Sequence, residues 1–263
     1  MILKPLPSIK YYFHKQPSVV SSLDTIRLAL EDETYSEFYF YAREYPRNYR
    51  YHLSNAEYRL KSIHEKYKNY YEYSKNELKK RNKDLFSFSQ EHKDIYKIYW
   101  DFEAFLNAVS ASLDTVARIC GLFYEQQTPL SFNRLCAKKE LGGIVDVLRL
   151  AQRRWVKKMK DYRDCFVHYT PIDNMCVISC VRYSVNWEIR CGLPINPNIR
   201  EQVGFRFSRR SELLRYSIFI LRNLNSLDRA IGKEIMQSHK RGKFPMKLNN
   251  LFFTGKRERV GDV

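Results

Sequence analysis

Glycine and proline are scarce in this chain, with nine of each among 263 residues. A turn-dense all-β fold needs many of both residues, so their scarcity argues against that class and favours helices. The sequence also lacks any run of about 18 apolar residues, the length that a membrane-spanning helix requires. No apolar signal region follows Met1. We therefore expect a folded cytoplasmic protein with no membrane partner.

Acidic residues are too few to balance the basic ones. Asp and Glu number 29 against 46 Lys and Arg, which gives a formal net charge of +17. A charge of this size favours polyanionic partners such as nucleic acid. Six cysteines without paired short spacings fit reduced thiols better than a disulfide framework. The composition thus indicates the class of partner and leaves the chemistry open.

Apolar residues recur at alternating spacings of three and four in three long segments, which is the pattern of amphipathic helices. The spacing predicts helices from Leu53 to about Arg81, from Ile95 to Phe123 and from Val145 to Phe166. A shorter helix is predicted from Val19 to Leu30. The aromatic stretch from Tyr35 to Tyr51, which contains a proline, fits no class clearly.

The period changes to two between Met175 and Arg190, where apolar and polar residues alternate as in a β-strand. The segment from Val203 to Phe207 is the predicted returning partner. Ser211 is the predicted N-cap of a last helix that continues to about Met236. The predicted fold is therefore mainly α, an up-and-down helical bundle with a small β-hairpin inserted at about 172–208, before the last helix. The predicted domains are an N-terminal extension packed on the bundle (1–52), the helical domain (53–238) and a basic C-terminal tail (239–263).

The segment Arg163-Asp-Cys-Phe-Val-His168 is the most chemically specific part of the chain, and it ends the third predicted helix shortly before Pro171. Asp164 lies four residues before His168, where its carboxylate can orient the imidazole and favour the protonated form. Pro171 disfavours helical geometry at the residue before it, so His168 is expected in the last turn, near the negative end of the helix dipole. A histidine poised near neutrality can transfer protons, and an arginine can offer paired donors to a phosphate.

Arg163 and His168 do not naturally share a helix face. Five residues rotate their side chains about 140° apart on a regular helix of 3.6 residues per turn. A two-fold dimer would solve this problem by bringing both residues from both chains around one phosphate.

An arginine followed by Asn, Asp or His, three further residues and a histidine resembles the hallmark of the HEPN superfamily. The predicted helix around Asp101 to Asp114 also resembles the central helix of such bundles. The resemblance covers roughly Ile95 to Met236. It implies a dimeric, metal-independent endoribonuclease of the kind found in toxin–antitoxin and phage-defence systems, with two motifs in one composite site and no cofactor.

The proposed catalytic residues are Arg163, Asp164 and His168. In the mechanism that the resemblance suggests, His168 transfers protons for attack by a ribose 2′-hydroxyl, Arg163 stabilises the phosphorane and Asp164 holds His168. Cleavage would leave a 2′,3′-cyclic phosphate. The predicted RNA-binding residues are four basic side chains on an adjoining stripe and the aromatic residue after the motif, namely Arg149, Arg153, Lys157, Lys160 and Tyr169. The expected partners are RNA, a second copy of the chain, and an antitoxin or other partner protein.

Other interpretations of these residues stay open. The segment Arg47 to His52 matches the same motif, although it directly follows Pro46 and precedes a predicted helix. Arg163, Asp164 and His168 can also be understood as residues that merely close a helix.

Two further interpretations give the region a different function. Cys165 and His168 are three residues apart and would form a zinc site together with Cys176 and Cys180, although this spacing is not a familiar one. The bundle would otherwise serve as a non-catalytic dimerisation or interaction scaffold.

Overall fold

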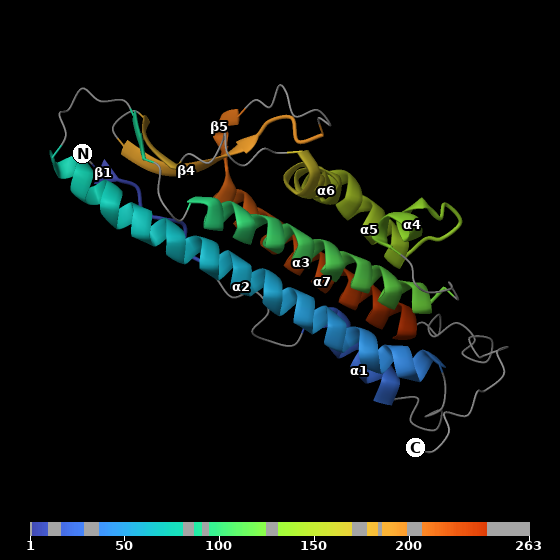
Figure 1. Ribbon diagram of the computed structural model, residues 1–263. Helices are drawn as coiled ribbons and strands as arrows, with labels where there is room; N and C mark the ends of the chain where they lie inside the picture. Colours follow the sequence, from blue (N-terminus) through green and yellow to red (C-terminus); the bar gives the residue numbers. More distant parts are fainter. Residues whose placement is uncertain are drawn as a thin grey trace, which may run out of the picture. The chain divides into compact units, whose positions relative to one another are not determined.

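The computed structural model describes residues 2–9, 17–28, 37–80, 87–90, 95–124, 131–169, 178–183, 186–198 and 207–240. Its fold is mainly helical, and the five described strands, which form a small sheet, all precede the last helix (Figure 1). The predicted mainly α class is therefore confirmed. The helices are α1 (Ser18–Leu28), α2 (Glu37–Lys80), α3 (Ile95–Leu122), α4 (Phe132–Ala137), α5 (Ile144–Ala151), α6 (Lys157–Asp164) and α7 (Leu213–Lys240).

The chain forms two compact units. The first comprises Met1–Lys15, His52–Ala111 and Ala151–Ser226, and the second comprises Gln16–Tyr51, Ser112–Leu150 and Leu227–Val263. Helices α2, α3 and α7 contribute residues to both units. The predicted division at residues 52 and 53 stays a prediction, and residues 241–263 of the predicted tail lie outside the described residues. None of the described helices is both long and apolar enough to cross a membrane.

Helix α2 begins well before the predicted start at Leu53. Ala42, Tyr45 and Tyr49 are buried and continue the apolar stripe of three-and-four spacings backwards from Leu53. Pro46 lies inside the helix, where it removes one backbone hydrogen bond but has a φ angle compatible with helical geometry. Burial of this aromatic stripe offsets the loss, which is why a proline does not end the helix here.

The third predicted helix is a continuous helical run with two π turns. Helix α5 leads into η2 (Gln152–Val156), then α6, then η3 (Cys165–Tyr169). In a π turn each backbone hydrogen bond spans five residues instead of four, and such turns are frequent at functional sites. The predicted motif occupies the end of α6 and the second π turn.

The sheet consists of β1 (Ile2–Leu3), β2 (Ser87–Gln90), β3 (Ile178–Tyr183), β4 (Asn186–Pro194) and β5 (Phe207–Glu212). The strand order is β1-β4-β3-β2, with β5 also paired to β4, and only the β1–β4 pair is parallel.

The single strand predicted from Met175 to Arg190 is wrong, because the chain reverses between Tyr183 and Asn186 and pairs β3 with β4. No glycine or proline lies at this reversal, and Ser184 and Asn186 fit the polar face of the alternating pattern, so the turn was not recognised.

Glu212, and not the predicted Ser211, caps helix α7. The Glu212 carboxylate accepts hydrogen bonds from the backbone N–H groups of Leu214 at 2.9 Å and Arg215 at 2.8 Å. The Tyr67 hydroxyl of α2 also donates to Glu212 and accepts from the N–H of Cys191 at 3.2 Å. Burial raises the pKa of Glu212 despite these donors. One buried carboxylate thus joins α2, the sheet and α7 within the first unit.

In the second unit, α1 packs closely against α7. Asp228 accepts hydrogen bonds from the backbone N–H groups of Ser18 at 2.7 Å and Val19 at 3.3 Å, and so caps the first turn of α1. A Cβ atom on Gly232 would lie 2.7 Å from the carbonyl carbon of Ser18. Only glycine permits this approach of the two backbones.

Candidate functional site

Aromatic packing within the first unit fixes the end of α6 and the turn η3. Phe166 of η3 stacks on Tyr99 of α3 at 5.7 Å between ring centroids and meets Phe102 edge-on at 5.3 Å. Tyr162 of α6 meets Tyr216 of α7 edge-on at 4.8 Å and donates a hydrogen bond to the carbonyl of Pro194 at 2.7 Å. These packed rings form a rigid base for the outward-facing side chains between them.

Arg163 is held at the surface by two contacts. Its Nε donates to the Asn107 Oδ1 of α3 at 3.1 Å, and its Nη1 lies 3.2 Å from Asp164 Oδ1. About a third of the Arg163 side chain remains exposed. The guanidinium therefore has a defined position, set by two different helical elements, and still presents donors to solvent.

Asp164 forms an ion pair with Arg163. The sequence pattern pairs it with His168, whereas the structure places its carboxylate against Arg163. Asp164 is half exposed, so its charge is also screened by water. Orientation of the imidazole by Asp164 remains a prediction, and the observed contact gives Asp164 a role in positioning Arg163.

His168 lies at the surface of η3. It and Val167 are exposed, while Cys165 and Phe166 before them are buried. The widened π turn matters for the motif, because five-residue hydrogen bonding brings residues five apart closer to one face than a regular helix does. Because Arg163 lies in α6 and His168 in η3, the 140° separation calculated for a regular helix does not apply to this pair unchanged. Tyr169 ends η3, and its side chain lies outside the described residues.

Exposed basic side chains line the helical run that leads to the motif. Arg153, Arg154, Lys157 and Lys158 are exposed, and Lys160 is half-buried. Lys158 lies over the Tyr162 ring, 5.9 Å from its centroid. Three of the predicted RNA-binding residues, Arg153, Lys157 and Lys160, thus belong to this stretch, to which the structure adds Arg154 and Lys158.

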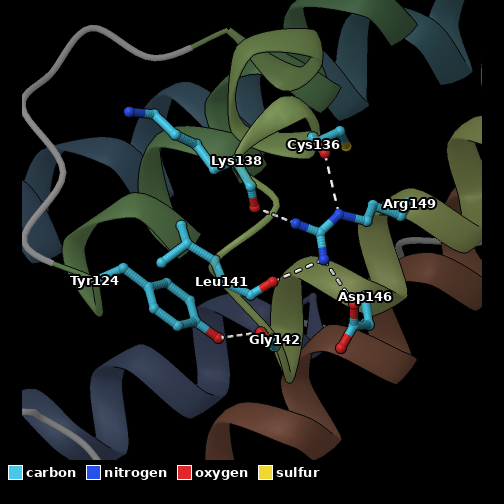
Figure 2. Close-up of polar contacts among 7 residues, drawn as sticks. All are labelled: Tyr124, Cys136, Lys138, Leu141, Gly142, Asp146 and Arg149. Atoms are coloured by element: carbon cyan, nitrogen blue, oxygen red, sulfur yellow. Dashed lines mark hydrogen bonds and ion pairs between the residues drawn. The ribbon is translucent and has the colours of Figure 1, made fainter.

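Arg149, also predicted to bind RNA, has a structural role in the second unit (Figure 2). Its guanidinium donates to the backbone carbonyls of Cys136 at 3.0 Å and Leu141 at 2.7 Å, and also to that of Lys138. It forms an ion pair with Asp146 at 2.7 Å as well. Because most of its donors are engaged inside the protein, we leave Arg149 out of the proposed RNA-binding surface.

The second motif match has a different setting. Arg47 and His52 both lie in the interior of the long helix α2, far from either helix end. Arg47 pairs with Glu44 at 3.0 Å, one helical turn before it. This environment is typical of a solvated helix surface, and it lacks the π turn that accompanies the first match.

The zinc interpretation receives no support from geometry. Cys165 and Cys180 are fully buried, whereas His168 is exposed. Cys176 lies outside the described residues. Among the side chains that the structure does describe, no group of three or more His, Cys, Asp or Glu is placed to hold a metal ion.

Two residues of this region were not predicted from the sequence as parts of the site. Asn107 lies 56 residues before Arg163, and no local pattern could have paired them. Trp100 did carry a signal, because it lies off the apolar stripe of α3 and is therefore expected at the surface. Its side chain is 56% exposed.

Comparisons with known proteins found no match among family models, curated proteins or solved structures. The resemblance to the HEPN superfamily therefore depends on the motif and its position.

Proposed function

We propose that this protein is a HEPN-like RNA-binding protein that cleaves RNA as a dimer without a metal ion. The observation that carries the proposal is the arrangement of Arg163, which is held by Asn107 and Asp164 at the surface, next to a π turn that presents His168. A fixed guanidinium and a titratable imidazole at one helix end are the groups that phosphodiester transesterification needs.

The mechanism assigns one step to each group. The neutral imidazole of His168 accepts the proton of a ribose 2′-hydroxyl, and the 2′-oxygen attacks the adjacent phosphorus. The guanidinium of Arg163 stabilises the negative charge of the phosphorane. The 5′-oxygen then leaves and takes a proton from the imidazolium of His168 in the second copy. The products are a 2′,3′-cyclic phosphate and a 5′-hydroxyl end.

The exposed basic residues before the motif support binding of the substrate. Arg153, Lys157 and Lys160 carry positive charge along the helical run toward Arg163, and phosphate contacts of this kind supply affinity without sequence preference. In a toxin–antitoxin or phage-defence setting, a cytoplasmic antitoxin or other partner protein would restrain such an enzyme.

Cleavage of RNA by the purified protein in EDTA tests the proposal. We expect activity to persist under chelation, and His168→Ala to reduce it by at least about a hundredfold through loss of general acid–base catalysis. Arg163→Ala should cause a loss of about the same size by removing electrostatic stabilisation of the phosphorane. The double variant Arg47→Ala, His52→Ala is the matched control and should retain activity. Activity that disappears on chelation, or a control as inactive as His168→Ala, would overturn the mechanism.

One observation favours the non-catalytic scaffold as a second candidate. Donors of Arg163 are already engaged by Asn107 and Asp164, as they would be in a residue that only closes a helix. Under this alternative the protein is a dimer and binds RNA at low salt, but leaves every RNA substrate uncut.

A further inference from the structure

We infer that Trp100 of α3 stacks on an unpaired base of the bound RNA, next to the phosphate that Arg163 holds. This inference rests on the proposed function and deepens it, because it names single-stranded RNA as the substrate class. It also assigns a base-binding role to a residue outside the motif.

Contacts within the first unit place helix α3 beside the motif. Asn107 of α3 meets Arg163, and Tyr99 of α3 meets Phe166. The later residue of α3 contacts the earlier residue of the motif, and the earlier residue of α3 contacts the later one, so the two segments run antiparallel. Trp100 therefore lies at the level of η3, the turn that carries His168.

Trp100 also shares a helix face with Asn107. Seven residues correspond to two turns of an α-helix with a rotation of only about 20°, and Asn107 is the residue that touches Arg163. Tyr96, one turn before Trp100, is 38% exposed on the same stripe. An aromatic stripe therefore leads along α3 to the side chain that positions Arg163.

The chemistry of this arrangement selects an unpaired base. An exposed indole offers a flat surface on which any base can stack, whereas bases within a duplex are already stacked on each other. Arg153, Arg154 and Lys157 are exposed on the helical run that leads to the motif, and cations there supply charge for RNA phosphates. Single-stranded RNA is thus a better match for this surface than duplex RNA or an apolar protein segment.

Tryptophan fluorescence can report on this contact specifically. The chain has three tryptophans, and Trp155 and Trp187 are only 5% and 1% exposed, against 56% for Trp100. Full-length His168→Ala protein, which should bind without cleaving, is titrated with a short single-stranded oligoadenylate. We expect quenching that saturates, that is absent in the His168→Ala, Trp100→Phe protein, and that is much weaker with a blunt duplex of the same sequence.

Affinity provides the second measurement. In the His168→Ala background, Trp100→Ala should weaken binding of the oligoadenylate about tenfold, as expected for loss of one stacked base. Tyr58→Ala is the matched control, because Tyr58 is an exposed aromatic residue of α2 in the same unit, and it should leave the affinity unchanged.

The outcomes separate this inference from the proposed function. Unchanged affinity in Trp100→Ala, while the wild type still cleaves RNA, overturns the inference alone. A Trp100→Ala protein that loses its dimer but keeps its RNA affinity assigns Trp100 to the subunit interface and overturns it as well. Quenching through Trp100 without cleavage by the wild type supports the inference and rejects the nuclease. No binding of RNA at all rejects both.

Discussion

Arg149 shows how a single side chain can organise a loop. Its guanidinium contacts three backbone carbonyls, that of Cys136 in the last turn of α4 and those of Lys138 and Leu141 in the segment between α4 and α5 (Figure 2). Hydrogen bonds to a charged donor contribute more than neutral ones, about 1.5–3 kcal/mol each when they are well formed.

Replacement of Arg149 by lysine should therefore destabilise the protein, although the charge is retained. An ammonium group cannot reproduce the planar arrangement of donors, and we expect a loss of about 2 kcal/mol. Urea denaturation measures this loss, and Arg153→Lys, at an exposed position in the same helical run, serves as the control. Equal stability of the two variants would show that the carbonyls do not depend on Arg149.

At the scale of the element, helix α7 depends on contacts at two separate points. Glu212 caps its start in the first unit, and Gly232 allows close packing with α1 in the second. Neither contact follows from the periodicity of the helix itself.

The Glu212 carboxyl makes the stability of the protein pH-dependent. Because burial raises its pKa in the folded state, folding favours the protonated form. The contribution of protonated Glu212 to the free energy of unfolding is fully present below the unfolded pKa of about 4.3. It is lost as the pH rises through the higher pKa of the folded state. Glu212→Gln should therefore gain stability relative to the wild type between about pH 4 and about pH 7, as measured by urea denaturation at both values. A difference that stays constant with pH would contradict this assignment.

Gly232→Ala should separate α1 from α7. Alanine is favoured over glycine in a helix by about 1 kcal/mol, but its Cβ would meet the Ser18 backbone at 2.7 Å. Overpacking against a backbone costs about 1–3 kcal/mol, so we expect net destabilisation and faster hydrogen exchange in α1. Lys233→Ala, an exposed neighbour on α7, reports on helix propensity alone and should be nearly neutral. A stabilised Gly232→Ala protein would show that α1 moves freely.

At the scale of the whole molecule, the net charge of +17 should dominate RNA affinity. We expect the logarithm of the association constant to fall linearly with the logarithm of salt concentration. Lys157→Ala should reduce the magnitude of this slope by about 0.7 if Lys157 contacts one phosphate of a single strand. Lys68→Ala, which removes an exposed lysine of α2 that pairs with Glu65, should leave the slope unchanged. Binding curves at several salt concentrations decide between these outcomes.

The sequence by itself determined the helical class, the limits of α3 and the position of the charged motif, because apolar periodicity and residue type are local properties. It could not show that α2 continues through Pro46, since burial of an aromatic stripe outweighs one lost hydrogen bond. It also could not show that the strand reverses after Tyr183, since no glycine or proline marks that point and the polar residues there fit the alternation of a strand.

Only the tertiary structure decided which charged residues are available to a ligand. Arg149 and Arg163 look alike in the sequence, yet carbonyls surround the first, while Asn107 holds the second at the surface. The carbonyl partners of Arg149 and the amide partner of Arg163 lie outside the helical turn of the arginine that they contact, and so the two roles depend on contacts that no local pattern encodes. The π turn of η3 is another feature that residue types alone do not encode, although it affects which residues share a helix face.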